Sequence, residues 1–281
     1  MGPPSTRRGS IRDCGRIDEK KLREISGCAA SRLVADVLWV HNDGDAECVY
    51  AIRPDGDTLA RLVLPVQPDD VEDIATVGQR GSRPPMLYLA DIGDNDCERD
   101  CVTLLRTPEP SLSQDDPDDE PKTILADYLE CISVVYPDRA HDAETLLVDP
   151  VDGGIYIVTK ADEGALVYQV PLNESDIPTG DPMRWVTSLS VSPISAGDIS
   201  ADGTHILLRS EDCGWLWRRR RGSTLAATLA EPPRCVAVRG KKQARNGEAI
   251  GFTADGKGYW TISEGKRERL CLFPLDPPIS P

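Results

Sequence analysis

Acidic residues recur at wide and similar intervals along this 281-residue chain. The distance from Glu24 to Glu72 is 48 residues, that from Glu144 to Asp198 is 54, and that from Asp198 to Glu248 is 50. Carboxylate oxygens arriving from several directions suit Ca²⁺, which takes ~6–8 oxygen ligands in flexible geometry. We therefore expect a divalent-cation site, with Ca²⁺ favoured and Mg²⁺ or Mn²⁺ as alternatives. Its expected ligands are Glu24, Asp43, Glu72, Asp73, Asp94, Asp142, Glu144, Asp198 and Glu248.

Two cations, Lys160 and Arg209, follow apolar runs at matching places. They would either neutralise the acids in a salt-bridged ring without a metal, or hold a phosphate or carboxylate beside one. His41 and His141 adjoin the acids and are candidates for an acid, a base or a ligand. In an enzyme, His141 and Glu144 would be the catalytic residues, and Lys160, Arg209 and His41 would bind the ligand.

Short apolar runs separated by glycine-containing turns must position these side chains. Residues 136–160 are typical: two runs rich in β-branched residues flank an Asp-Pro-Val-Asp-Gly-Gly turn, which indicates a β-hairpin. Four such strands repeat with a period near 50 residues, a pattern that favours propeller blades. We predict an all-β, five-bladed β-propeller. Six blades are the alternative if the longer interval from Glu72 to Glu144 hides a further module.

The last module lacks a fourth strand, and the segment before Glu24 can supply it. Such a strand closes the ring and removes an open edge that would invite aggregation. The expected division is an N-terminal segment (1–22), one propeller domain (23–275) and a disordered tail (276–281). Within a blade, the first strand starts where the antiparallel second strand ends. The acids and cations are therefore expected at one mouth of the central channel.

Composition limits the partners. The chain has 32 Lys+Arg against 47 Asp+Glu and a net charge of −15, which argues against nucleic acid. No apolar run approaches the ~18 residues of a membrane span. We expect a monomer whose partner is a small anionic molecule or another protein. Nine cysteines and no visible secretory signal favour a reduced, cytoplasmic setting, or an extracellular one if the chain is a processed form.

Several motifs resemble those of a largely uncharacterised, bacterial-type β-propeller family. The similarity covers residues 24–275, and the chain departs from the pattern at Gly44 and Val71 and in lacking a secretion signal. The motifs are Trp39-Val-His-Asn-Asp43, Glu72-Asp-Ile-Ala75, Asp91-Ile-Gly-Asp-Asn95, His141-Asp-Ala-Glu144, Gly197-Asp-Ile-Ser200 and Gly247-Glu-Ala-Ile250. More distantly, the acidic channel looks like that of calcium-dependent lactonases of the senescence-marker and paraoxonase type, and of phytase-like or esterase-like propellers. Such a likeness is architectural.

The sequence thus leaves three functions open. The favoured one is a divalent-cation-binding propeller with no assigned reaction. The second is a metal-dependent hydrolase of a lactone or phosphoester, in which a carboxylate or His141 activates water. The third is a protein-interaction propeller whose channel is salt-bridged and holds no metal. Whether the protein is an enzyme is not decided by the residues alone.

Overall fold

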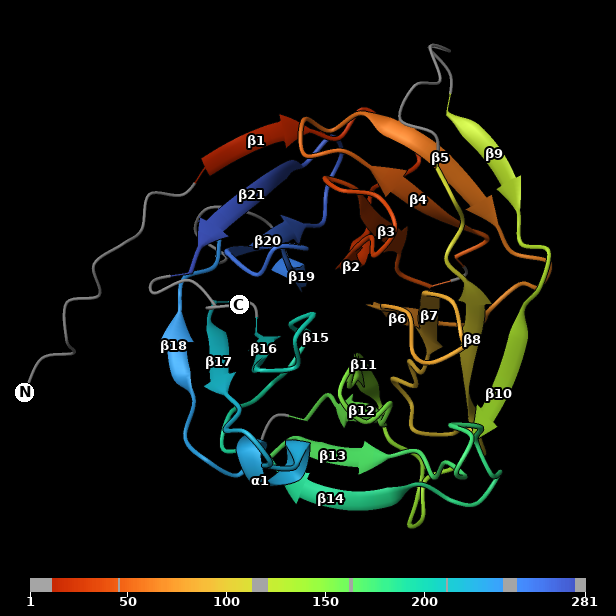
Figure 1. Cartoon of the computed structure of the whole chain (residues 1–281), viewed down its shortest axis with the longest axis vertical. Coiled ribbons are helices and arrows are strands. Elements are labelled where there is room, and N and C mark those ends of the chain that lie inside the picture. Colours follow the sequence, from red (N-terminus) through yellow and green to blue (C-terminus); the bar gives the residue numbers. More distant parts are fainter. Residues whose placement is uncertain are drawn as a thin grey trace, which may run out of the picture.

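The described residues form five β-sheets arranged around a central axis (Figure 1). The computed structural model describes residues 12–44, 46–112, 121–161, 164–210, 212–239 and 247–275. The fold is a five-bladed β-propeller, as predicted, and the six-bladed alternative is wrong. The long interval between Glu72 and Glu144 holds an additional strand instead of an additional blade.

Each blade is built on four antiparallel strands, of which the first to third in chain order run outward from the axis (Figure 1). Blade 1 contains β2 (Ile25–Ala30), β3 (Leu38–Asn42), β4 (Cys48–Ile52) and β5 (Thr58–Val63). Blade 2 contains β6 (Val71–Val77), β7 (Met86–Asp91), β8 (Val102–Pro108) and β10 (Glu130–Val134). Blade 3 contains β11 (Ala143–Val148), β12 (Ile155–Thr159), β13 (Leu166–Gln169) and β14 (Arg184–Ser188). Blade 4 contains β15 (Ala196–Ile199), β16 (His205–Arg209), β17 (Gly214–Arg218) and β18 (Arg234–Val236). Blade 5 contains β19 (Gly247–Phe252), β20 (Gly258–Ser263), β21 (Arg269–Pro274) and β1 (Arg12–Arg16).

Strand β1 closes the ring, as expected. It pairs antiparallel with β21, the last strand of the described chain. It also touches blade 1, because the Gly15 N–H donates to Pro54 O at 2.8 Å. A Cβ at Gly15 would lie 1.5 Å from Asp55 O, so only glycine permits this approach. One strand therefore fastens the last blade to the first.

The segment between β8 and β10 differs from expectation. Strand β9 (Lys122–Leu125) lies between two strands of blade 2 in the sequence, but it pairs parallel with β5 and forms a fifth strand at the outer edge of blade 1. A short helix, α1 (Leu225–Leu229), lies between β17 and β18 in the sequence. The Thr224 side chain caps its N-terminus. Residues 1–11 and 276–281, and most of the acidic 114–121 stretch, lie outside the described residues.

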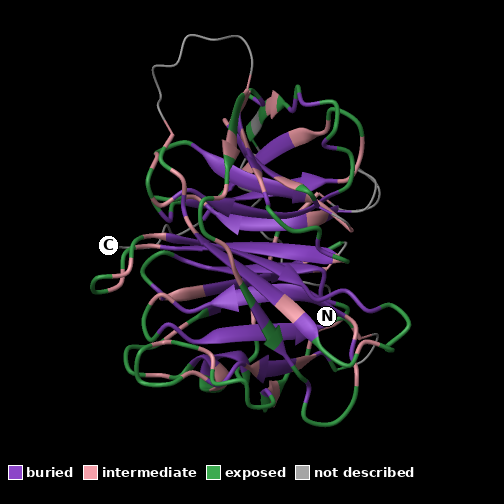
Figure 2. Ribbon diagram, turned by 90° about the vertical axis from the view of Figure 1, so that its right-hand side faces the viewer, coloured by how far each residue is buried: buried purple, intermediate pink, exposed green. Residues whose placement is uncertain are grey.

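The core lies between blades. Strands β2, β6, β7, β11 and β12 are buried along their whole length, and exposed residues are mostly in the turns (Figure 2). Their side chains alternate between two neighbouring blades, which explains why the inner strands read as continuous apolar runs. The described apolar residues form five clusters, one between each pair of adjacent blades. No helix in the described ranges is long and apolar enough to cross a membrane.

Candidate metal centre

Three carboxylates converge at the mouth of the channel, and we call Asp43, Asp70 and Glu72 the carboxylate cluster. One oxygen from each lies within 4.8 Å of the others. Asp43 follows β3, Asp70 immediately precedes β6, and Glu72 is the second residue of β6. The Val71 N–H donates to Gly44 O at 2.9 Å and so holds the two chain segments together.

Asp91, the last residue of β7, fixes the segment that carries Asp70. Its two carboxylate oxygens accept the N–H groups of Asp69 and Asp70, each at 3.1 Å. Arg99 Nη1 pairs with the same carboxylate at 2.9 Å. Because these contacts occupy the Asp91 carboxylate, Asp91 holds the backbone of Asp70 in position and is not itself a member of the cluster.

Gly93 has no side chain, and two carboxylates of the cluster occupy the space that a side chain would fill. A Cβ at this position would lie 2.3 Å from Asp70 Oδ2 and 2.4 Å from Glu72 Oε1. The backbone of the Asp91-Ile-Gly-Asp-Asn segment therefore forms one wall of the cluster. A cation held by the two carboxylates would lie against this wall.

Burial and mutual repulsion both disfavour the ionised form of the carboxylates in the cluster. Burial, followed by the charges of Glu144, Asp43 and Asp70, raises the pKa of Glu72 to about 10. Burial is also the main cause that raises the pKa values of Asp43 and Asp70. Asp43 Oδ1 is a buried oxygen with no hydrogen-bond partner among the described residues. A cation would pair with this oxygen and remove the repulsion, so the donor set fits a hard divalent ion.

A β-bulge recurs where the inner strands begin. The register of β6 with β7, β11 with β12, and β19 with β20 shifts around Glu72, Glu144 and Glu248 respectively. In β2 the same shift falls at Ser26. A bulge re-aims the side chain of the extra residue. Three equivalent glutamates are therefore directed to one mouth, and blade 1 contributes a serine at this position.

Glu144 and Lys160 form an ion pair beside the cluster. Lys160 Nζ donates to Glu144 Oε1, and the lysine stands directly after β12. Burial raises the pKa of Glu144 to about 7, against the opposing charge of Lys160. Burial and the charges of Glu264 and Glu144 likewise raise the pKa of Glu248 to about 7. The mouth therefore has groups that exchange protons near neutrality.

The remaining acids expected as ligands have other surroundings. Asp73 Oδ2 accepts the Leu146 N–H at 2.9 Å, and Asp198 Oδ2 accepts the Phe252 N–H at 2.8 Å, so both carboxylates join the inner strands of neighbouring blades. Asp94 accepts two N–H groups of its own loop, and Asp142 accepts the Asp94 N–H. Glu24 is exposed and precedes β2. We therefore leave these five residues out of the cluster.

Arg209 and the two histidines also lie apart from the cluster. Arg209 is fully buried and donates to Ala249 O at 3.1 Å, which ties blade 4 to blade 5. His141 Nε2 lies 3.0 Å from Tyr168 Oη and 3.1 Å from Asp138 Oδ1. His41 is completely buried, and burial lowers its pKa to about 4. The His41 Nε2 atom is buried and has no hydrogen-bond partner among the described residues. The catalytic role of His141 and the ligand-binding roles of His41 and Arg209 stay predictions from the sequence.

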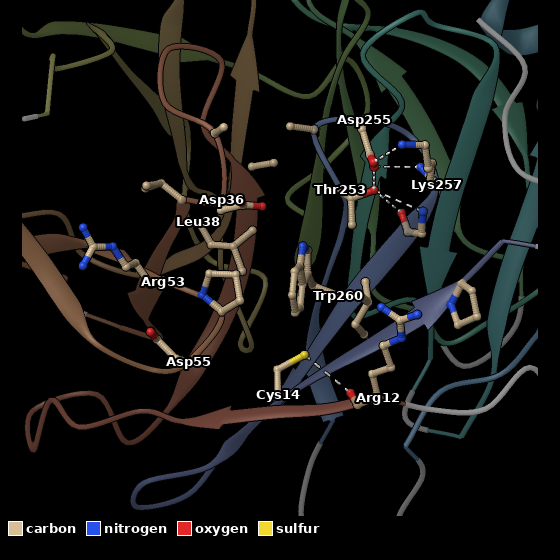
Figure 3. Close-up of a pocket in the computed structure, with 18 residues that line it drawn as sticks. Arg12, Cys14, Asp36, Leu38, Arg53, Asp55, Thr253, Asp255, Lys257 and Trp260 are labelled. Carbon is tan, nitrogen blue, oxygen red and sulfur yellow. Dashed lines mark hydrogen bonds and ion pairs between the residues drawn. The ribbon is translucent and has the colours of Figure 1, made fainter. Parts of the chain in front are cut away.

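A groove of about 1020 Å³ opens between blades 1 and 5. Leu38 and Trp260 line it from the two blades, and Arg12 and Cys14 line it from β1 (Figure 3). It includes the turn between β19 and β20, at the ends of the inner strands remote from Glu72 and Glu248. The groove and the carboxylate cluster are therefore on opposite faces of the propeller.

Comparisons with known proteins give matches among solved structures. No protein-family model matches the chain, and no curated protein matches its sequence. Among solved structures, the PQQ-bound aldose sugar dehydrogenase from Streptomyces coelicolor is 12% identical, with a TM-score of 0.52, over 97% of this chain and 99% of that one. A gluconolactonase from Xanthomonas campestris is 10% identical, with a TM-score of 0.47, over 95% and 98% of the two chains. The class that fold and site define is a β-propeller with an acidic channel mouth.

Proposed function

We propose that this protein is a divalent-cation-binding β-propeller in which Asp43, Asp70 and Glu72 hold Ca²⁺. The observation that carries the proposal is the convergence of three carboxylates, two of which lie against the backbone of Gly93, where no side chain takes up the space. All the protein donors are oxygens, and they come from two neighbouring blades. Ca²⁺ accepts such irregular oxygen sets and completes its shell with water, whereas Mg²⁺ requires near-ideal octahedral geometry.

Direct binding measurements test this proposal. Metal-free protein is titrated with Ca²⁺ in a calorimeter, and its thermal melt is recorded in chelator and in excess Ca²⁺. We expect one ion per chain and a higher Tm with Ca²⁺, because a ligand that binds only the folded state stabilises it. Asp43→Asn should weaken binding at least tenfold, while the exposed Asp127→Asn, outside the cluster, should bind as the wild type does. Absence of heat and of a Tm shift would favour the salt-bridged, protein-binding propeller instead.

The Glu144–Lys160 pair favours a second candidate, a metal-dependent hydrolase of a lactone or phosphoester. A bound cation would polarise the ester oxygen. Glu144, with a pKa near neutrality, is suited to accept a proton from water, and Lys160 lies where it would offset developing negative charge. Lactones and phosphoesters are assayed with the wild type, Glu144→Gln and Asp127→Asn. Turnover that survives in Glu144→Gln would remove Glu144 from the mechanism.

A further inference from the structure

Two cysteines of blade 4 lie in direct contact. Cys213 Sγ and Cys235 Sγ are 2.8 Å apart, only about 0.75 Å more than the ~2.05 Å of a disulfide bond. Both cysteines are free thiols in the structure. No other sulfur–sulfur contact occurs between the cysteines that the structure describes, including Cys97 and Cys101, which are close in sequence.

The strand pairing holds the two sulfurs together. Cys213 ends the turn after β16 and directly precedes β17, while Cys235 is the middle residue of β18. In the β17–β18 ladder, Gly214 pairs with Val236 and Trp215 pairs with Cys235. Ser210 donates its N–H to Cys213 O at 2.8 Å and so fixes the turn. The contact is therefore imposed by backbone hydrogen bonds on both sides.

The pair is accessible to a reagent from solvent. Cys235 is exposed and Cys213 is half-buried, in contrast to Cys28 and Cys271, which are buried. Strand β18 is the outer strand of its blade and spans only three residues. Burial, followed by the hydrogen bond with Cys235, raises the pKa of Cys213. Cys235 is the more exposed of the two, so a reagent in solvent reaches its sulfur first.

We propose that Cys213 and Cys235 form a reversible disulfide when the protein meets a small-molecule disulfide such as glutathione disulfide. The Cys235 thiolate attacks one sulfur of the oxidant, whose S–S bond breaks and releases one thiol. Cys213 then loses its proton to solvent and attacks Cys235 Sγ, which releases the second thiol. The two protein thiols lose two electrons in total, and the oxidant gains them as two thiols. The new bond fastens the edge strand β18 to the turn before β17.

Mass spectrometry of the whole chain tests the proposal. Reduced protein is incubated with glutathione disulfide, and its thiols are counted after denaturation. We expect the count to fall from nine to seven, two being consumed, and to return to nine in dithiothreitol. Trypsin cleaves after Arg209, Arg218, Arg234 and Arg239, so the cysteines fall in separate peptides, 210–218 and 235–239. A non-reducing digest should contain these two peptides joined.

Variants give the controls. Cys213→Ser and Cys235→Ser should each abolish the joined peptide, whereas Cys131→Ser, which removes an exposed cysteine on the outer strand of blade 2, should leave it. Oxidation should raise the Tm of the wild type by roughly 5 °C, and that of Cys213→Ser should not change. Glutathione adducts without a joined peptide, or a cross-link to another cysteine, would overturn the proposal.

Discussion

Gly93→Ala tests the carboxylate cluster without touching a charge. The added Cβ would meet Asp70 Oδ2 at 2.3 Å and Glu72 Oε1 at 2.4 Å, whereas ordinary contact begins at 3.4 Å. The two oxygens must therefore retreat by 3.4 − 2.3 = 1.1 Å and 3.4 − 2.4 = 1.0 Å. Ca²⁺–oxygen bonds span only ~2.3–2.6 Å, so such a displacement removes both carboxylates from coordination.

The expected result is a Kd for Ca²⁺ raised roughly 100-fold, or about 2.8 kcal/mol of binding free energy. The fold should survive, because the φ angle of Gly93 is not in the left-handed region and alanine can adopt it. Gly78→Ala is the matched control, since a Cβ there meets no atom within 4 Å. Calorimetry gives both Kd values, and circular dichroism checks the fold. A Gly93→Ala protein that binds Ca²⁺ as tightly as Gly78→Ala would refute the placement of the ion.

Three further predictions concern stability. Arg219→Met removes the charged partner that lies 2.5 Å from the fully buried Asp149 carboxylate, which keeps the hydrogen bond from the Val151 N–H, and should cost about 3–5 kcal/mol of unfolding free energy in urea. Burial raises the pKa of Asp198 from 3.8 to about 6 in the folded state, so that state binds the proton more tightly and stability falls as pH rises from 4 to 6. The full effect of 6 − 3.8 = 2.2 units is about 3 kcal/mol, and urea melts of Asp198→Asn should lack this part of the pH dependence. Gly15→Ala forces a Cβ into the neighbouring turn and should destabilise the ring closure by about 2–3 kcal/mol, measured against Gly78→Ala.

The propeller was predictable because its signals are local and repeated. Gly-containing turns and short apolar runs mark each hairpin, and the missing strand of the last module indicated β1. The transfer of β9 to blade 1 was not predictable. Four strands per module leave room for one strand within residues 123–136, whereas the structure has two, at 122–125 and 130–134, and which sheet each one joins depends on long-range pairing.

The site was predictable only in part. Asp43 and Glu72 were expected, but Asp70 was missed because it precedes the strand; the Asp69-Asp70 doublet before the apolar run was the available signal. Glu72 and Asp73 both looked like ligands. The bulge decides between them, since it directs Glu72 to the cluster and leaves Asp73 to accept the Leu146 N–H. Strict alternation of side chains cannot anticipate such an irregularity.

The pairing of β1 with β21 has a consequence for biosynthesis. A ribosome releases β1 long before β21 exists, so the first strand waits while four blades assemble beside it. A contact between such distant segments is entropically expensive and slow to form. The ring therefore cannot close before β21 has been made, and until β1 pairs with it the outer edge of β21 is an unpaired strand edge, open to chaperones or to misassembly.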